Sequence, residues 1–359
     1  MSDRSPLVAW RTLDFPADWN AAFGFGGPLE LEVGFGDGRF TVRRAAAAPS
    51  TRFVGLEVSS GSLQRALRRI KRQGLDNVLI AKVGAEFALR ELFAAGSLGG
   101  IVVNFPDPWP KERHVKHRLL KKSFYELAAT RLVAGGEIRL ATDHEEYRDF
   151  ATEQAASSGL FQASWPEPPD AVFETKYALK WRDLGKPLYY VVFTRTDSHA
   201  EPVPHLERPR EMPHALLTGA LPPTSALSKT VLRYGGGHVV LHEAAAVMPR
   251  GSAPPDVRGL VEERASDPGR ERRVERHDAA HGGPEHDGRA RWLVRATIEE
   301  PDLKQQLLVM VQQRQADEVI VKLETFGDPI ITEAARGAVH AVTEWLIANT
   351  DLSIRRRSY

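Results

Sequence analysis

Short apolar runs alternate with amphipathic stretches along the first half of the chain. Several of these stretches carry apolar residues at helical spacing, and one of them, 62–73, ends at Gly74 as helices often do. Strands that alternate with helices predict βαβ units and a mostly parallel sheet. The predicted strands are 29–33, 52–58, 77–83, 100–105, 137–141 and 188–194, and the predicted helices are 39–48, 62–73, 86–94, 119–132 and 144–157.

The pattern changes after Thr196. Six prolines within 201–223 predict a linker, and 251–290 holds 16 charged residues in 40 without an aromatic residue. Such a segment buries too little apolar surface to fold alone, so we expect a disordered insertion there. The predicted elements after the linker are a hairpin within 226–247, strands at 291–297 and 318–323, and helices at 304–313 and 333–348. The predicted domains are 1–196, a proline-rich linker at 197–225, and a smaller α+β domain at 226–359.

Composition limits the classes of protein to which this chain can belong. Of 359 residues, 42% are hydrophobic and 26% are charged, which is typical of a soluble globular protein. No apolar stretch approaches the roughly 18 residues of a membrane span, and residues 1–10 lack the pattern of a secretory signal. The chain has no cysteine, which excludes disulfides, cysteine-ligated zinc and thiol catalysis. We therefore expect a cytoplasmic protein without a metal site or a membrane contact.

The net charge of +1 does not indicate a nucleic-acid partner, but two local clusters are basic. Residues 111–122 include six Lys or Arg, and 65–72 include five with no acid. Clusters of this kind either follow a phosphate backbone or form a solvated surface.

A glycine-rich turn follows the first predicted strand, in Glu32-Val-Gly-Phe-Gly-Asp-Gly38. Glycines at such a turn let a ligand approach the backbone, here at Gly34 and Gly36. The acid before the first glycine suits a cationic ligand better than a pyrophosphate. Glu57 ends the second strand, where an acid accepts hydrogen bonds from ribose hydroxyls. S-Adenosylmethionine has both a positive charge and a ribose, so these residues are candidate contacts for it; purely structural roles are the alternative.

A rigid loop is predicted after the fourth strand, where Asp107 lies between two prolines. Prolines restrict the backbone, and a rigid loop is a suitable platform for a reacting group. The basic stretch 111–118 follows at once, which favours phosphate contacts beside that group. After the fifth strand, the Asp143 carboxylate can accept hydrogen bonds from the ring N–H and amino group of a guanine; capping of the next helix is the alternative.

Together these motifs resemble the bacterial tRNA (guanine-N7)-methyltransferase family. The most specific piece is Pro106-Asp-Pro-Trp-Pro-Lys111 with the basic residues after it, and the resemblance covers about 29–195. It implies a class I Rossmann-like methyltransferase fold, with a mostly parallel sheet and an antiparallel last strand. The implied reaction moves a methyl group from S-adenosylmethionine to N7 of a guanine in the variable loop of tRNA.

The resemblance also implies roles for individual residues, with Asp107 as the catalytic residue. The implied contacts to S-adenosylmethionine are Glu32, Gly34, Gly36, Glu57, Gly84 and Asp107; those to the guanine or the tRNA are Lys111, Asp143, Thr175, Lys176 and Tyr177; and those to the RNA backbone are Arg113, His114, Lys116 and Arg118. Two positions depart from the family pattern, because Gly84 and Ala178 stand where the family has acids. Glu86 or backbone groups are the candidate substitutes for the first.

N7 of guanine carries a free lone pair, so methyl transfer to it requires no general base. Positioning is then expected to supply most of the catalysis, with nearby carboxylates stabilising the positive charge that develops on the base. Two alternatives remain: a methyltransferase that acts on another RNA or on a protein, and a catalytically inactive RNA-binding protein with the same fold.

Overall fold

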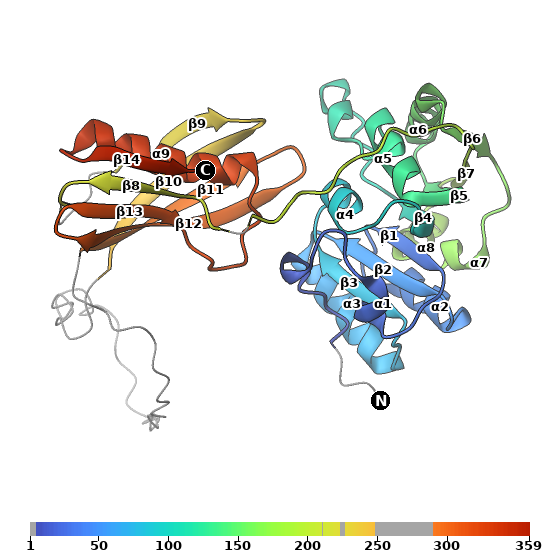
Figure 1. Cartoon of the computed structure of the whole chain (residues 1–359). Helices are drawn as coiled ribbons and strands as arrows, with labels where there is room; N and C mark the ends of the chain where they lie inside the picture. The colour runs from blue at the N-terminus through green and yellow to red at the C-terminus, as the bar shows by residue number, and fades with distance from the viewer. Residues whose placement is uncertain (1–4, 210, 223–226, 248–289) are drawn as a thin grey trace, which may run out of the picture. The chain divides into compact units, whose positions relative to one another are not determined.

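The computed structural model describes residues 5–209, 211–222, 227–247 and 290–359 (Figure 1). The chain divides into two compact units, Met1–Arg208 and Pro209–Tyr359, and each contains a sheet. The insertion predicted at 251–290 falls outside the described residues, apart from Ala290. In the part of the chain that the structure describes, no helix has the length and apolar character to cross a membrane.

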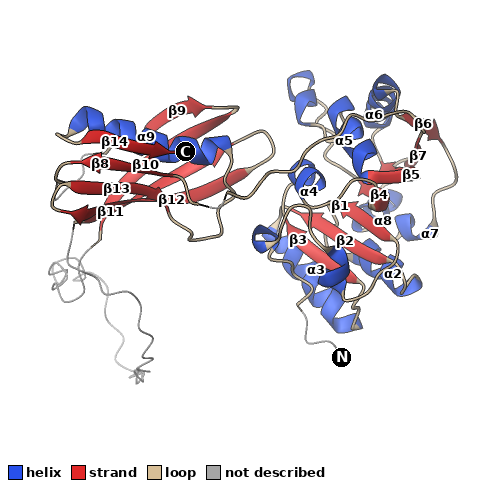
Figure 2. Cartoon of the chain, in the orientation of Figure 1, coloured by secondary structure: helices blue, strands red, loops and turns tan. Residues whose placement is uncertain are grey.

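The sheet of the first unit confirms the predicted class I Rossmann-like methyltransferase fold (Figure 2). Its strand order is β3-β2-β1-β4-β5-β7-β6. The parallel strands are β1 (Leu29–Val33), β2 (Arg52–Glu57), β3 (Val78–Lys82), β4 (Leu98–Asn104) and β5 (Leu132–Thr142). β7 (Tyr189–Arg195) is antiparallel to β5, as predicted for the last strand, and β6 (Phe161–Ser164), which was not predicted, is antiparallel to β7. The order reverses between β1 and β4, where ligands bind in sheets of this type.

Helix α3 (Ser60–Gln73) shows how local sequence sets the bounds of an element. At its start, the Ser59 hydroxyl accepts a hydrogen bond from the Ser62 N–H. Gly74 ends it with φ of 62°, a left-handed conformation that favours glycine. Its apolar stripe packs in one core cluster with α2, β2 and β3. The other helices described in this unit are α1 (Trp19–Phe23), α2 (Arg39–Ala47), α4 (Ala85–Glu91), α5 (Lys122–Arg131), α6 (Glu145–Ser158), α7 (Asp170–Phe173), α8 (Lys176–Asp183), and the 3₁₀ helices η1 (Trp10–Thr12) and η2 (Glu112–His117).

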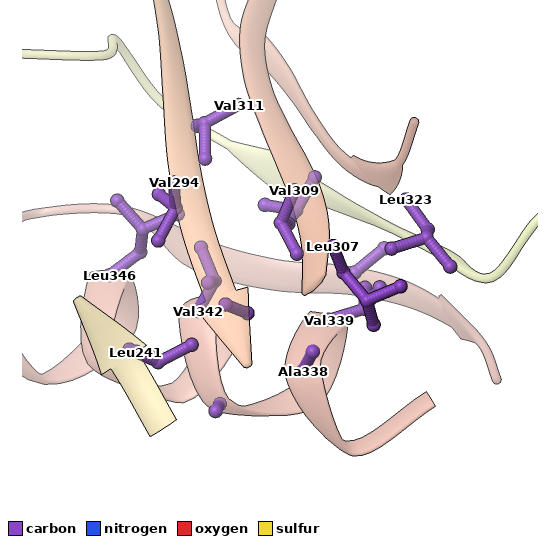
Figure 3. Close-up of a cluster of buried hydrophobic side chains, with 14 of the residues drawn as sticks. Leu241, Val294, Leu307, Val309, Val311, Leu323, Ala338, Val339, Val342 and Leu346 are labelled. Carbon is purple, nitrogen blue, oxygen red and sulfur yellow. The ribbon is translucent and has the colours of Figure 1, made fainter. Parts of the chain in front are cut away.

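The second unit is an antiparallel sheet with helix α9 (Glu333–Asn349) on one face. Its strand order is β14-β8-β13-β12-β11-β10-β9. Figure 3 shows side chains such as Val294, Val309 and Val342 meeting in the core between the sheet and the helix. The strands are β8 (His214–Thr218), β9 (Thr230–Tyr234), β10 (Gly237–Ala246), β11 (Arg291–Glu299), β12 (Lys304–Gln315), β13 (Glu318–Leu323) and β14 (Ser353–Ser358). The predicted α+β character of this region is confirmed.

The helix predicted at 304–313 is wrong, because this segment is strand β12. Alternate residues Gln305, Leu307, Val309 and Val311 are buried, which is the period of a strand. β12 pairs with β11 on one side and β13 on the other, so it lies inside the sheet. Buried Gln305 hid this alternation from the sequence; its amide is satisfied by the backbone of Ile330, at 2.8 and 3.0 Å.

Two strands of the second sheet were not predicted. β8 lies within the stretch predicted as a linker, where Ala215 and Leu217 are buried against the core although prolines flank the strand. That stretch therefore contributes a strand to the second sheet. β14 has five exposed residues out of six, so it lacks the alternation that identifies a half-buried strand.

Candidate functional site

A cavity of about 730 Å³ opens at the carboxyl ends of β1, β2 and β4. It therefore lies at the point where the strand order reverses. Segments far apart in the sequence form its wall, including the turn after β1, the end of β2 and the loop after β4. The predicted site residues that line it are Glu32, Gly34, Gly36, Glu57, Asp107, Thr175 and Tyr177.

The turn after β1 takes its shape from glycines in left-handed conformations. Gly34 and Gly36 have φ of 74° and 57°, and a Cβ at either would meet no described atom within 4 Å. Backbone conformation, rather than crowding, therefore requires glycine at both. Gly38 differs, because φ is 77° and a Cβ there would lie 2.7 Å from the Ala66 Cβ of α3. The third glycine of the motif thus allows α2 and α3 to pack closely.

Glu57 fixes this turn to the end of β2. Its carboxylate accepts hydrogen bonds from the backbone N–H groups of Gly36 at 3.1 Å, Val58 at 2.8 Å and Ser59 at 2.9 Å. These bonds hold a negative charge at the cavity wall in a defined orientation, as recognition of a pair of hydroxyl groups requires.

Glu32 is a buried acid at the end of β1, with 6% of its surface exposed. Burial raises its pKa to about 7, although the Thr41 hydroxyl, Arg44 and the Asn104 amide each lower it. The Thr41 hydroxyl donates a hydrogen bond to this carboxyl. A nearby positive charge favours the ionised form of a carboxyl group, so a cationic ligand would lower this raised pKa and bind the charged form.

Asn104 is a site residue that the sequence did not predict. It ends β4, lines the cavity and lies close enough to Glu32 to lower its pKa. Its amide nitrogen and oxygen are both buried, and apart from the interaction with Glu32 they have no hydrogen-bond partner among the described residues. Buried polar groups are nearly always satisfied, so this amide is suited to bind a polar ligand group. Its position at a strand end, just before the Pro-Asp-Pro loop, is the sequence feature from which it could have been predicted.

The loop after β4 has an unusual backbone on both sides of Asp107. Phe105 and Trp109 have φ of 50° and 42°, a left-handed conformation that is costly for aromatic residues and is found where the surrounding structure enforces it. The Phe105 N–H donates to the Ala141 carbonyl of β5 at 2.7 Å. The exposed side chain of Asp107 lines the cavity between these two residues.

Arg118 is buried, with 5% of its surface exposed, whereas it was predicted to contact RNA. Its guanidinium donates to the Pro108 carbonyl at 2.9 Å and lies over the Phe150 ring at 4.8 Å. These contacts attach the loop to the buried side chain of Arg118. The prediction for Arg118 could not take account of the chain folding back on itself, and the location favours a structural role.

The rest of the basic stretch forms η2 and its ends. Lys111, Arg113 and Lys116 are exposed, and none of them lines the cavity. His114 is half-buried, with its ring 5.6 Å from that of Trp109.

The predicted guanine contacts lie in two places. Thr175 caps α8, since its hydroxyl accepts from the Ala178 N–H at 3.1 Å, and Tyr177 lies beside Phe105 with ring centroids 6.2 Å apart. Asp143 follows β5, outside the cavity lining, and its carboxylate is 3.2 Å from the ammonium of Lys186. The side chain of Lys176 is outside the described part of the structure.

Gly84 lies at the end of β3 and is the first residue before α4. Its neighbours Val83 and Ala85 line the cavity. Glu86, the candidate substitute for the missing acid, points elsewhere: it lies outside the cavity lining and pairs with Lys121 at 3.3 Å. The wall here is therefore formed by backbone and small apolar groups.

Comparisons with known proteins show the family to which the chain belongs. A family described as "Putative methyltransferase" matches residues 27–191. The tRNA (guanine-N(7)-)-methyltransferase of Thermus thermophilus is 38% identical over 343 residues, which are 96% of this chain and 96% of the relative. The chain belongs to this family. A second tRNA (guanine-N(7)-)-methyltransferase, from Deinococcus radiodurans, is 38% identical over 327 residues, 89% of each chain.

Other members of the tRNA (guanine-N(7)-)-methyltransferase family match a shorter part of this chain. That of Thermotoga maritima is 37% identical over 179 residues, 50% of this chain and 57% of the relative. The matches from Thermus and Deinococcus are long enough to extend into both units, so the second unit is shared with some members.

Proposed function

We propose that this chain is a tRNA (guanine-N7)-methyltransferase that uses S-adenosylmethionine. The observation that carries the proposal is a cavity at the point where the strand order reverses, which is lined by seven of the predicted contacts from four separate segments. Membership of the family supports the tRNA substrate. Because that substrate is tRNA, we place the activity in the cytoplasm.

The donor groups of the cavity fit S-adenosylmethionine. Glu32, buried and with a raised pKa, suits the positive charge of the cofactor, and Glu57 presents a fixed carboxylate for the ribose hydroxyls. The buried amide of Asn104 lies beside Glu32 and offers a further donor and acceptor to a ligand. When bound, the cofactor supplies an activated methyl group on a sulfonium.

The residues of this chain then act by positioning and by charge. Two hydrogen bonds fix the loop that carries Asp107: one runs from the loop to the Ala141 carbonyl, and the other from Arg118 to the loop. The carboxylate of Asp107 therefore has a defined place at the cavity. N7 of the acceptor gains positive charge as transfer proceeds, and the carboxylates of Asp107 and Asp143 stabilise that charge. The exposed cations Lys111, Arg113 and Lys116 would contact phosphates of the tRNA.

The proposal is tested by transfer of radioactive methyl groups from S-adenosylmethionine into bulk tRNA, followed by nucleoside analysis. We expect 7-methylguanosine as the product, and none from a transcript whose variable-loop guanine is replaced by adenine. Asp107→Ala should lower the rate by about 100-fold. Asp149→Ala, at an exposed acid of α6, is the matched control and should leave the rate unchanged. A different labelled nucleoside, or a labelled protein, would contradict the proposal.

A further inference from the structure

Asp143 and Lys186 form an ion pair at the carboxyl edge of the first sheet. Asp143 immediately follows β5, and Lys186 lies three residues before β7, the antiparallel neighbour of β5. The Lys186 Nζ and an Asp143 carboxylate oxygen are 3.2 Å apart. The two side chains are 44% and 18% exposed, so a ligand can reach both. An ion pair with this exposure contributes little to stability, so stabilising the fold is not a sufficient role for it.

The pair is connected through the chain to residues that line the cavity, although neither member lines it. Ala141, two residues before Asp143, accepts the hydrogen bond from Phe105 that fixes the Asp107 loop. Phe105 and Tyr177 line the cavity together, and the segment from Tyr177 onward leads through α8 to Lys186. Both members of the pair are therefore attached to segments that contact the cavity lining at Phe105 and Tyr177.

The pair presents a hydrogen-bond acceptor beside a donor, which matches the Watson–Crick edge of guanine. On that edge O6 is an acceptor, whereas N1–H and the amino group are donors. A carboxylate has no proton to donate, so Asp143 alone would leave O6 unpaired. Adenine has the reverse order, an amino donor in place of O6 and a bare N1, so it would face the ammonium with a donor and the carboxylate with an acceptor.

We propose that Lys186 determines specificity for guanine by donating a hydrogen bond to O6, while Asp143 accepts from N1–H and the amino group. This inference rests on the proposed function. The existing contact between the two side chains holds the donor and the acceptor side by side before the base arrives, which lowers the entropy lost on binding.

The test compares three acceptor bases with the full-length enzyme. tRNA transcripts carry guanosine, 6-thioguanosine or inosine at the acceptor position, since sulfur is a weak acceptor and inosine lacks the amino group. For the unchanged enzyme we expect kcat/KM about tenfold lower with 6-thioguanosine than with guanosine. Lys186→Met should lower kcat/KM for guanosine about tenfold and bring the two bases within about twofold of each other. The ratio of kcat/KM for inosine to kcat/KM for guanosine should be the same in both enzymes, because both retain Asp143.

Two further variants separate this role from a structural one. Lys186→Arg keeps a donor and should retain the preference for guanosine over 6-thioguanosine. Lys180→Met removes a nearby exposed cation of α8 and should leave all three values unchanged. If Lys186→Met lowered kcat/KM equally for all three bases, the inference would be overturned. Such a result would show that Lys186 only stabilises the fold. If the unchanged enzyme failed to methylate the guanosine transcript, the proposed function itself would be at fault.

Discussion

At the scale of single residues, Glu32 links the structure to a measurable dependence on pH. Burial raises its pKa to about 7, so a substantial fraction of the free protein is protonated at this position near neutrality. A bound cation requires the ionised form. Affinity for S-adenosylmethionine should therefore fall as pH falls below 7, approaching tenfold for each pH unit, and should be constant above it. Titration calorimetry between pH 5.5 and 7.5 measures this directly.

Glu32→Gln provides the control for that titration. It keeps the shape and the hydrogen bond from Thr41 but cannot ionise, so binding should be weaker at pH 7.5 and nearly independent of pH. A pH dependence that survives in this variant would assign the titration to another group.

Arg118 differs from its basic neighbours in burial, and the difference predicts two separate effects. Arg113→Ala with Lys116→Ala should flatten the salt dependence of tRNA affinity by about one unit of slope for each lost phosphate contact. Arg118→Ala should lower kcat by releasing the Asp107 loop, while the salt dependence is unchanged. Filter binding over a series of salt concentrations, together with turnover assays, separates the two. Equal flattening in both variants would place Arg118 on the RNA surface.

Sequence patterns identify a site residue best where its role depends on a strand end. Glu32 and Glu57 lie at the carboxyl ends of β1 and β2, Asp107 follows β4, and all three line the same cavity. The sequence did not indicate Asn104 as a site residue or the burial of Arg118, and the reason is the same for both. Whether an amide is satisfied, or a guanidinium is buried, depends on long-range packing that no local pattern contains.

At the scale of elements, close packing between the start of α2 and α3 depends on one glycine. An added methyl group at Gly38 would lie 2.7 Å from the Ala66 Cβ, at a φ of 77° that disfavours alanine. Gly38→Ala should lower the free energy of unfolding by roughly 1–3 kcal/mol, because of overpacking and backbone strain. Urea denaturation monitored by circular dichroism provides the measurement.

A double-mutant cycle isolates the contact between the two helices. Gly38→Ala combined with Ala66→Gly removes the 2.7 Å contact between the two Cβ atoms, but it keeps a 3.0 Å contact with the Ala66 Cα and the backbone strain. The double variant should be about 1 kcal/mol more stable than the two single effects predict by addition. Strict additivity would show that strain at Gly38, and not the helix contact, accounts for the loss.

Elements were predicted well where apolar periodicity was clear, as for α3 and for α9 in the second unit. β12 was predicted as a helix because buried Gln305 interrupts the apolar alternation, and its hydrogen bonds to the Ile330 backbone help to make a polar residue acceptable there. β8 and β14 are specified by the neighbours with which they pair, since one is flanked by prolines and the other is mainly exposed.

At the scale of the whole molecule, the chain between the sheets is partly attached to the first unit. The Leu206 N–H donates to buried Glu91 at 2.7 Å, and buried Arg131 donates to the Val203 carbonyl at 2.9 Å. A chain that ends after Arg208 should therefore unfold cooperatively and bind the cofactor. A chain that ends at Thr196 should have a lower melting temperature, because two buried charged groups lose partners. Equal melting temperatures would show that these bonds contribute nothing.

The outer strand β14 has a consequence for how the protein behaves in concentrated solution. An edge strand offers unpaired backbone groups on which another chain can continue the sheet. Three arginines in a row, residues 355–357, lie on this edge of the described sheet, and the first and third form ion pairs with Glu318 and Glu344. Two copies that approach by this edge therefore meet with like charges. Mutual repulsion at β14 would delay the growth of fibres from partly unfolded chains, a kinetic protection that added salt would weaken.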